Sequence, residues 1–352
     1  MAKSISASSK SAKALTAIAA RLAALIPRDR LDPAVLAWVA SAPPQRVWSV
    51  AFSGGADSLA LLLLLWAHWP QRRRRLQALH FNHRLRGADS RADAAFCRRV
   101  ARGLGITFIA GSWRAAKPDA SEAAARVARM TFIERHGGTV WFGHQQDDVA
   151  ETMLMRLARG SGAGGLAAPR PVHVHPLGRV HLRPLLPLKK TEIVRALCAA
   201  GATWCEDASN PGDRYFRNRV RSAVIPAWVE AAQRDALAGA ARSRVLLEED
   251  DVALEAWLDE LQPLRSPGVL ALAPLQGKPR ALLRRALHRW LAGQPRAGEV
   301  SRAAFDALLN ALASGRPTRH SLGRHGFAVI DRASLRFQPM GKAGRNFHRS
   351  AN

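Results

Sequence analysis

Paired cysteines and long apolar runs are missing from this chain of 352 residues. Its three cysteines, Cys97, Cys198 and Cys205, form no CxxC pair and no zinc-ligand spacing, which argues against a disulfide framework and favours a reducing, cytoplasmic location. No apolar run reaches the roughly 18 residues that a membrane-spanning helix needs. The longest run, residues 59–67, is typical of a buried helix face. We therefore expect no membrane partner.

Acidic residues are also scarce. Asp and Glu total 27 against 53 Lys and Arg, which gives a net charge of +26. An excess of this size usually has a polyanionic partner, with nucleic acid the first candidate and an anionic membrane surface the second. The alternative is a GC-rich genome that fills solvated faces with arginine.

The first 28 residues contain neither Asp nor Glu and are rich in Ser, Ala, Lys and Arg. This composition is similar to that of a transit peptide. It is equally typical of a basic leader before a short helix at residues 15–26, which is the interpretation that we prefer. Residues 1–45 are accordingly predicted to stand apart from the domain that follows.

Strand-like and helix-like segments alternate from residue 47 to about residue 168. Short apolar strands are predicted at residues 47–52, 76–81, 106–110 and 139–142. Helices are predicted after them at residues 58–68, 90–103, 120–136 and 147–159. Such alternation predicts a parallel sheet covered by helices on both faces. Ligands of these sheets bind at the carboxyl ends of the strands, where the unusual motifs of this sequence lie.

A change of character after residue 225 predicts a second region. Residues 160–165 are Gly-rich and indicate a mobile loop, and residues 182–188 with a helix at 191–200 complete an α/β domain at 46–225. Residues 226–352 are predicted to be mainly helical, with helices at 226–261, 280–291 and 301–313 and a short β pair within 316–337. The predicted fold class is therefore a parallel-sheet α/β domain followed by a mainly helical region.

The segment between the first strand and the first helix of that domain has the composition of a phosphate-binding loop. It consists of Ser53, Gly54, Gly55, Ala56, Asp57 and Ser58. Adjacent glycines let a backbone curl around an anion, the helix N-terminus adds unpaired N–H groups, and serine hydroxyls donate to phosphate oxygens. Asp57 would repel phosphate but suits Mg²⁺, which is usually held by carboxylates and phosphate oxygens. The segment lacks the Walker pattern GxxxxGK[ST], and the competing interpretation is a turn with an acid at a helix start.

A second polar group follows the fourth predicted strand and consists of His144, Asp147, Asp148 and Glu151. Spacings of three and four place these side chains on neighbouring faces of a helix. One acid would cap the helix, but three carboxylates in five residues exceed what capping needs and suggest Mg²⁺ coordination or base chemistry. A capped, solvated helix start is the alternative, and the position beside the phosphate loop disfavours it.

The loop pattern SGG-x-DS after a first strand resembles that of the PP-loop ATP pyrophosphatases. This resemblance implies a Rossmann-like, adenine nucleotide alpha hydrolase-like domain that cleaves ATP between its α- and β-phosphates and transfers AMP to an oxygen of the substrate. HQQDDVAET at residues 144–152 is similar to the tRNA(Ile)-lysidine synthetase family within this group. Further matches, in family order, lie at residues 80–87, 125–129, 154–157, 159–162, 183–186, 206–210 and 217–221.

That family adenylates the 2-carbonyl oxygen of the wobble cytidine in the isoleucine tRNA with a CAU anticodon, and free L-lysine then displaces AMP to give lysidine. By resemblance, residues 53–58 bind ATP, and Asp57 holds or organises Mg²⁺ and pyrophosphate with one of the acidic pair, Asp147 or Asp148, of which Asp148 is preferred. His144 and Glu151 line the reaction centre, where Glu151 could equally hold the lysine ammonium. Arg126 is expected to face the activated base or its phosphate, and the alternative is an exposed helix arginine.

The remaining expectations concern the RNA. Arg217, Arg219 and Arg221 are expected to meet tRNA phosphates, which position a substrate without reading its sequence. A polar loop that shapes the substrate pocket, or merely forms a turn, is expected at Glu206, Asp207 and Asn210. Residues 226–352 are expected to contact the tRNA(Ile) body, and a second copy of the chain, forming a homodimer, is a candidate partner.

Three other functions fit parts of the sequence. A PP-loop enzyme that inserts sulfur into an RNA base generally relies on paired or catalytic cysteines, whereas Cys97 and Cys198 fall within predicted helices and Cys205 is solitary. An amidating synthetase would leave the charge of +26 unexplained. A non-catalytic RNA-binding protein with a vestigial nucleotide site would not be expected to retain the acids of both motifs.

Overall fold

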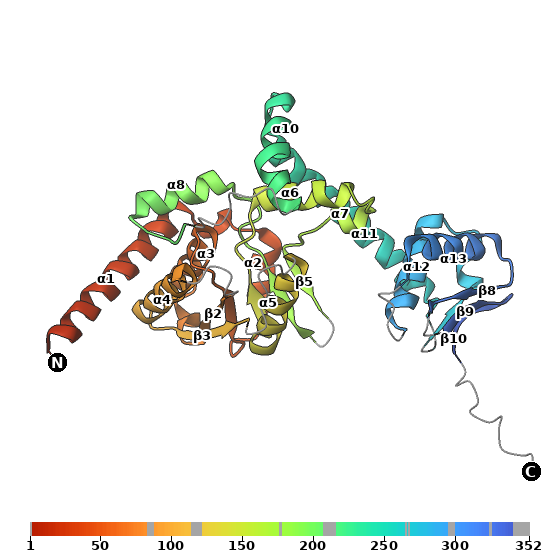
Figure 1. Ribbon diagram of the computed structural model, residues 1–352, viewed down its shortest axis with the longest axis horizontal. Coiled ribbons are helices and arrows are strands. Elements are labelled where there is room, and N and C mark those ends of the chain that lie inside the picture. Colours follow the sequence, from red (N-terminus) through yellow and green to blue (C-terminus); the bar gives the residue numbers. More distant parts are fainter. Residues whose placement is uncertain are drawn as a thin grey trace, which may run out of the picture. The chain divides into compact units, whose positions relative to one another are not determined.

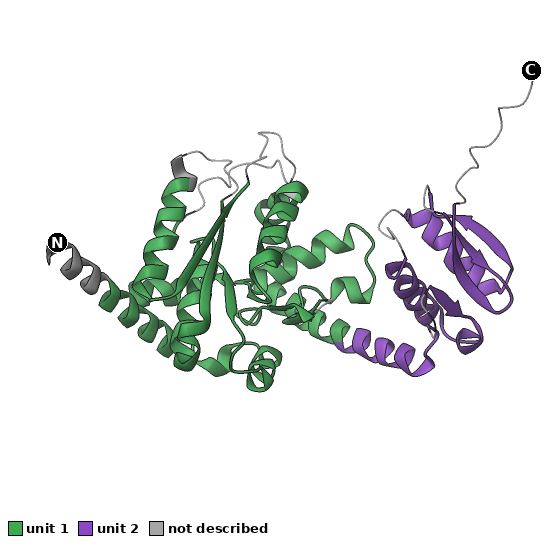
Figure 2. Ribbon diagram, turned by 90° about the horizontal axis from the view of Figure 1, so that it is seen from below, with its two compact units in different colours: residues 1–248 green, residues 249–352 purple. Residues whose placement is uncertain are grey.

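The computed structural model describes residues 2–82, 88–113, 122–175, 178–206, 216–264, 266, 268–294, 300–323 and 326–340. The chain divides into two compact units, residues 1–248 and 249–352, which Figure 2 distinguishes by colour. The boundary between these units falls inside helix α11 (Ala236–Leu261), whereas the sequence predicts that the α/β domain ends at residue 225. Asp207 and Asn210 of the predicted polar loop lie outside the described residues.

Unit 1 is built on a six-stranded sheet with the order β3-β2-β1-β4-β6-β5 (Figure 1). Its strands are β1 (Trp48–Ala51), β2 (Leu76–Asn82), β3 (Thr107–Ser112), β4 (Thr139–Trp141), β5 (Val172–Val174) and β6 (Val180–Leu182). All neighbouring pairs are parallel except β5 with β6, which is antiparallel. The predicted parallel α/β sheet is therefore confirmed. Its antiparallel edge escapes the sequence pattern because β5 is short and largely exposed.

Helices lie on both faces of this sheet. Those of unit 1 are α1 (Ala2–Leu25), α2 (Pro33–Ser41), α3 (Ala56–His68), α4 (Ala88–Gly103), α5 (Glu122–His136), α6 (Gln146–Leu157), α7 (Ala163–Leu166), α8 (Lys190–Ala200), α9 (Phe216–Arg219), α10 (Ile225–Ala232) and the first part of α11. A π-helical segment, Val220–Val224, joins α9 to α10. Within the part of the chain that the structure describes, no helix combines the length and apolarity needed to span a membrane.

The central strands are covered on both faces, so they read as apolar runs rather than as polar–apolar alternation. Trp48 and Val50 of β1 belong to the larger core of unit 1, whereas Ala51 packs with a smaller cluster. In β4 the same alternation assigns Trp141 to the larger core and Val140 to the smaller cluster. Because successive side chains of a strand point to opposite faces, these two clusters mark the two layers of helices.

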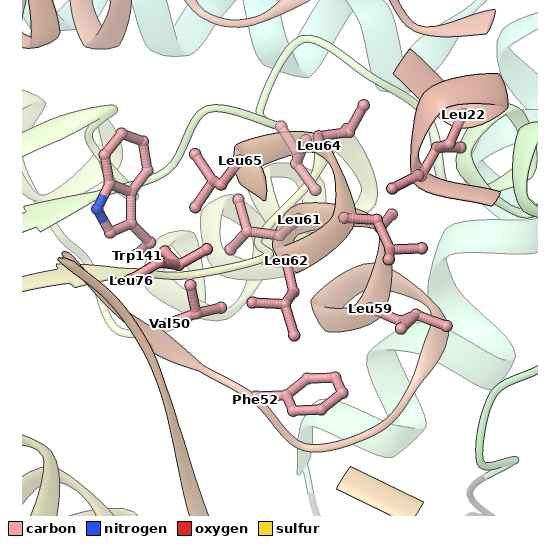
Figure 3. Packing of buried hydrophobic residues seen from close by; sticks show 14 of the residues in the cluster. Leu22, Val50, Phe52, Leu59, Leu61, Leu62, Leu64, Leu65, Leu76 and Trp141 are labelled. Carbon is pink, nitrogen blue, oxygen red and sulfur yellow. The ribbon is translucent and has the colours of Figure 1, made fainter. Parts of the chain in front are cut away.

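Helix α3 lies in the larger core and packs against both β1 and α1. Every side chain of residues 59–65 is buried, as expected for a helix that is apolar all round. Figure 3 shows Leu61 and Leu62 beside Val50 and Phe52. The strong burial of this helix fixes its N-terminal end, which carries the predicted phosphate loop.

The N-terminal segment is an integral part of unit 1 rather than a leader that stands apart. Helix α1 packs against α3, α4 and α8 (Figure 1), and its Ala19 and Leu22 are fully buried. The predicted short helix at residues 15–26 is the C-terminal part of this longer helix. Composition alone did not reveal the packing partners of this helix.

The smaller cluster joins α5 to the opposite face of the sheet, where Ile133 packs with Val140 and Phe142. On the chain segment after α6, residues 160–165 are not simply a mobile loop, because α7 begins at Ala163. The guanidinium of Arg156 donates a hydrogen bond to the carbonyl of Gly165 and holds this turn. The loop prediction is wrong there, since glycine content does not reveal a turn that a distant side chain stabilises.

The single helix predicted at residues 226–261 is two helices. Helix α10 ends at Ala232, its C-cap residue Gln233 has a left-handed φ of 49°, and α11 begins at Ala236. Neither Gly nor Pro marks this break, so the sequence pattern does not show it.

Unit 2 packs the C-terminal part of α11 and two further helices with a small sheet around its own core, which includes Leu258, Leu287, Trp290, Leu308 and Leu335. The elements are α12 (Arg280–Ala292), α13 (Arg302–Ser314), β7 (Val269–Ala271), β8 (Thr318–Ser321), β9 (Gly326–Ile330) and β10 (Ser334–Pro339). The strands are antiparallel in the order β7-β10-β9-β8. The C-terminal region is mainly helical as predicted, but its β tail is larger than a pair, because β8, β9 and β10 all lie in it and β7 joins them from a distant part of the sequence.

Candidate active site

The two predicted motifs meet at the point where the strand order of the sheet reverses. β1 and β4 are neighbours at this switch point, and in open α/β sheets ligands bind outside the carboxyl ends of such strands. At this point the backbone after β4 lies directly against the first turn of α3. A Cβ atom on Gly143 would come within 2.8 Å of the carbonyl oxygen of Asp57. Only glycine permits this approach.

The phosphate loop is held in a curled form by its own hydroxyl groups. Gly54 has a φ of +96°, a conformation that favours glycine. Its amide donates to Ser58 Oγ at 3.3 Å, the amide of Gly55 donates to Ser53 Oγ at 3.4 Å, and the two hydroxyls lie 3.1 Å apart. The N-cap position of α3, Gly55, offers no side-chain cap. The first-turn N–H groups of α3 therefore have no capping side chain and are suited to an anion.

Two cysteines pack behind this loop, although the sequence treats them as separate. A Cβ on Gly54 would lie 3.0 Å from the sulfur of Cys97 and 3.2 Å from that of Cys205. The amide of Cys205 also donates to the Gly54 carbonyl at 3.0 Å. Burial strongly raises the pKa of the Cys97 thiol. A thiol that stays protonated is a poor nucleophile, so Cys97 lends no support to sulfur transfer.

Asp57 has one oxygen that faces a cation and one that has no hydrogen-bond partner. Its Oδ2 lies 3.6 Å from Lys190 Nζ, whereas its Oδ1 is buried and makes no hydrogen bond. Burial raises the pKa of Asp57, and the Lys190 ammonium opposes part of that rise. A buried carboxylate oxygen without a partner is costly unless a ligand satisfies it. This oxygen fits the ligand set that Mg²⁺ prefers.

The adjacent acids Asp147 and Asp148 have different tasks. Asp147 Oδ2 accepts a hydrogen bond from the backbone amide of Lys190 at 3.1 Å and so secures the start of α8. Asp148 Oδ2 accepts from the amide of Gln145 at 3.0 Å in a capping box, as the helix-cap interpretation predicts. Its other oxygen faces the site. Asp148 is therefore the acid of this pair that belongs to the candidate site.

Two of the arginines predicted to meet tRNA, Arg217 and Arg221, form ion pairs with the carboxylates of α6. Arg217 Nη2 lies 2.5 Å from Asp148 Oδ1, and Arg217 Nε lies 2.7 Å from Glu151 Oε2. Arg221 Nε lies 2.5 Å from Glu151 Oε1. Arg219, between them, is exposed, and its guanidinium lies 5.9 Å from the ring centre of Phe216. The spacing of four between the paired arginines places them on one helical face, a signal that the sequence already contained.

These contacts bear on where Mg²⁺ would bind. Asp57 fits, since it has an unsatisfied buried oxygen. Both oxygens of Asp148 are already engaged, one by the Gln145 amide and one by Arg217. Among the described residues, no three His, Cys, Asp or Glu side chains are arranged to hold a metal ion. A metal at this site would therefore take Asp57 and phosphate oxygens, and Asp148 would join it only if Arg217 moved away.

His144 is held by Arg183, which lies in the family match at residues 183–186 but to which the sequence assigned no role. Arg183 Nε donates to His144 Nδ1 at 3.2 Å, and Arg183 Nη1 donates to the carbonyl of Arg170 at 2.7 Å. Because arginine only donates, the neutral imidazole carries its hydrogen on Nε2 and offers it as a donor. Burial lowers the pKa of His144 well below its usual range, and Arg183 and other nearby arginines lower it further. This arrangement suits hydrogen-bond donation to an anion better than base catalysis.

Arg126 lies at the edge of the same group. Its side chain is exposed on α5, yet its charge contributes to lowering the pKa of His144, Arg156 and Arg183. The pKa of Arg183 falls to about 10, mainly through burial. Arg126 thus adds to a strongly cationic region that favours phosphate groups, and its predicted contact with the activated base or its phosphate stays a prediction.

Lys190 is the other residue that sequence reasoning missed. It lies beside Lys189 at the N-terminus of α8, where the helix dipole disfavours cations. Two cations in that position are a signal of another role.

The predicted polar loop can be followed only at Glu206, because the residues after it lie outside the described range. The predicted part of Glu206 in the substrate pocket therefore stays a prediction.

Together, the switch point of the sheet, the curled loop and the carboxylates define a nucleotide-binding α/β protein whose phosphate loop is not of the Walker type. A family model of the PP-loop domain matches residues 30–228, more than half of the chain. The chain therefore belongs to the PP-loop family. This confirms the resemblance that the loop pattern indicates.

Its curated relatives include the tRNA(Ile)-lysidine synthases of two bacteria. That of Geobacter sulfurreducens is 33% identical over 276 residues, which cover 73% of this chain and 56% of that protein. That of Pseudomonas syringae pv. tomato is 36% identical over 286 residues, which cover 77% of this chain and 63% of that protein. The chain thus spans about three fifths of the length of these relatives. The predicted likeness to lysidine synthetases is confirmed.

Among solved structures, a U34-tRNA thiolase, NcsA, from Methanococcus maripaludis is similar over 66% of this chain and 78% of that chain. The sequence identity is 17% and the TM-score is 0.44. A likeness at this level carries no conclusion about the reaction.

Proposed function

We propose that this protein is an ATP-dependent carbon–nitrogen ligase that joins free L-lysine to C2 of the wobble cytidine of tRNA(Ile) with a CAU anticodon, giving lysidine, AMP and pyrophosphate. The observation that carries the proposal is the meeting of the phosphate loop with the α6 carboxylates at the switch point of the sheet, where Asp57 keeps a buried oxygen unsatisfied. The lysidine synthase relatives support the choice of acceptor and nucleophile.

The reaction has two displacements. The 2-carbonyl oxygen of cytidine attacks the α-phosphorus of ATP and pyrophosphate leaves. The ε-amino nitrogen of lysine then attacks C2, the C2–O bond to AMP breaks, and the amine loses a proton. Adenylation is needed because a carbonyl oxygen leaves poorly, whereas AMP leaves readily.

The phosphate loop serves the first displacement. Its amides and the N-terminus of α3 bind the pyrophosphate portion of ATP, and the Ser53 and Ser58 hydroxyls exchange their mutual contact for phosphate oxygens. Mg²⁺, when bound, would neutralise phosphate charge, with Asp57 as its protein ligand.

The arginines around His144 would bind the α-phosphate of ATP, which becomes the phosphate of AMP. His144 offers an Nε2 hydrogen, and Arg183, Arg217 and Arg126 supply fixed positive charge around it. Donors held in place before the reaction stabilise charge as it develops. Glu151 is already bound by Arg217 and Arg221, so a lysine ammonium at Glu151 would have to compete with both arginines.

The tRNA itself would bind through the positive charge of the chain, which totals +26. Exposed Arg219 is a candidate for phosphate contact, as is the region 226–352. The cytoplasmic location and the homodimer stay predictions.

A sulfur-inserting PP-loop enzyme is the second candidate, because Cys97 and Cys205 both pack against Gly54. The buried, protonated state of Cys97 argues against it. The products distinguish the two, since thiolation requires a sulfur donor and no lysine.

The nucleotide products test the proposal. Purified protein, radiolabelled ATP, lysine and a tRNA(Ile) transcript are expected to give AMP and pyrophosphate, and omission of lysine or tRNA is expected to stop AMP formation. Release of ADP, or AMP release that needs a sulfur donor instead of lysine, would contradict the proposal.

A further inference from the structure

Lys190 extends from the start of α8 to the phosphate loop. Its backbone amide is held by Asp147 at 3.1 Å, and its Nζ lies 3.6 Å from Asp57 Oδ2. The side chain is 45% exposed, so the ammonium is open to a ligand. Lys190 therefore joins α6, α8 and the first turn of α3 at one point.

The phosphate loop would repel ATP electrostatically, and Lys190 would reduce this repulsion. Residues 53–58 contain no cation and one carboxylate, Asp57, so the loop is anionic where ATP would bring several negative charges. A Walker loop carries its own lysine for the β- and γ-phosphates. Here the loop has none, and the nearest ammonium that the structure places beside Asp57 comes from a different element.

We propose that Lys190 binds the β- and γ-phosphates of ATP and then the departing pyrophosphate, which supplies from α8 the cation that the phosphate loop lacks. The inference rests on the proposed use of ATP at this loop. With phosphate present, the ammonium lies between the Asp57 carboxylate and a phosphate oxygen and donates to both, since a lysine ammonium has three donors. Hydrogen bonds between charged groups are the stronger ones.

The neighbouring lysine offers a matched control. Lys189 Nζ bonds to Asp235 at the start of α11, away from Asp57. This pair is largely exposed, and such pairs contribute little to stability. Lys189→Ala and Lys190→Ala therefore remove the same side chain from adjacent positions, and only the second removes a cation from the phosphate loop.

The experiment measures equilibrium binding by calorimetry with Mg²⁺ and no tRNA or lysine. Its ligands are α,β-methylene ATP, inorganic pyrophosphate and AMP. Lys190→Ala is expected to lower the affinity for α,β-methylene ATP and for pyrophosphate by about 10- to 100-fold. Its affinity for AMP is expected to stay within about twofold of the wild-type value, because AMP lacks the β- and γ-phosphates. Lys189→Ala is expected to leave all three within about twofold.

Unchanged binding of α,β-methylene ATP to Lys190→Ala would overturn the inference. An equal loss of affinity for AMP would also overturn it, because that would indicate a general disturbance of the site. So would a loss of affinity for α,β-methylene ATP in Lys189→Ala equal to that in Lys190→Ala. The proposed function is tested separately, because binding here needs neither lysine nor tRNA. A wild-type protein that forms no lysidine but shows these affinities would refute the function and leave the role of Lys190 intact.

Discussion

The α-carbon of Gly143 lies so close to the backbone of Asp57 that a methyl group at residue 143 would come within 2.8 Å of the Asp57 carbonyl oxygen. Gly143 follows β4, and Asp57 lies in the first turn of α3. This contact sets the distance between the phosphate loop and the carboxylates of α6. The geometry of the candidate site therefore depends on a residue that carries no side chain.

Gly143→Ala is expected to move α3 away from β4 and to lower kcat/KM by about 100-fold. It is also expected to cost about 1–3 kcal/mol of unfolding free energy, because it overpacks a contact between two backbones. Gly138→Ala is the control, since a Cβ there meets nothing within 4 Å. Steady-state kinetics and urea unfolding measure both effects. Equal kinetics for the two variants would show that the close approach is unimportant.

Asp57→Asn is expected to reduce AMP formation by at least about 100-fold while tRNA affinity stays within about twofold. The amide keeps the shape of the side chain but removes the charge that would hold Mg²⁺. The measurement pairs turnover with a filter-binding titration of the tRNA transcript. Loss of tRNA affinity would mean that the loop contacts RNA and is wrongly assigned to ATP.

Arg217→Lys is expected to lower the rate of adenylation by about 10²- to 10³-fold. Lysine keeps the charge but loses the fork that joins Asp148 to Glu151. Affinity for tRNA is expected to change little, because the charge is retained. ATP–pyrophosphate exchange in the presence of tRNA follows the chemical step, and filter binding follows the RNA.

The matched variant for RNA contact is Arg219→Ala, at the exposed position between the two paired arginines. It is expected to weaken tRNA binding and to reduce the slope of log affinity against log salt by about 1. Adenylation at saturating tRNA should be unaffected. If Arg219→Ala and Arg217→Lys changed tRNA binding alike, the division of roles between these arginines would be refuted.

Acid is expected to destabilise unit 1 through His181. This residue is buried, lies 2.8 Å from His175 through their ring nitrogens, and has its pKa lowered to about 3, chiefly by burial. The unfolded chain regains the ordinary pKa of about 6.5 and binds more protons between these values, so stability falls as pH drops below about 6.5. We expect the unfolding free energy of His181→Gln to fall less than that of the wild-type protein when the pH is lowered from about 7.5 to about 5. Tryptophan fluorescence during urea unfolding measures both values. An equal fall in the two proteins would contradict this prediction.

Local patterns were sufficient to predict the sheet domain and its two motifs. The apolar runs of β1 and β4 and the helices after them follow from composition within a few residues. The phosphate loop and HQQDDVAET lie at strand ends, where parallel sheets bind ligands. The acid at this helix start predicted a cap from Asp147 or Asp148, and the structure shows that Asp148 makes it.

The pairing of side chains could not be predicted in the same way. Arg217 and Arg221 lie 66 and 70 residues from Glu151 in sequence, and their contact depends on how α9 and the following π-helical segment pack against α6. Likewise, Arg183 reaches His144 across 39 residues, and Lys190 reaches Asp57 from another helix. The break between α10 and α11 left no Gly or Pro in the sequence. These features arise from tertiary packing, which no local pattern records.

The central claim is the covalent transfer of lysine to one cytidine. Radiolabelled lysine, ATP and wild-type protein incubated with a tRNA(Ile) transcript bearing CAU are expected to give labelled tRNA whose label resides in the wobble nucleoside after digestion. The same transcript with uridine at the wobble position is the control and is expected to stay unlabelled. Absence of label from the CAU transcript, or equal label in both transcripts, would contradict lysidine formation.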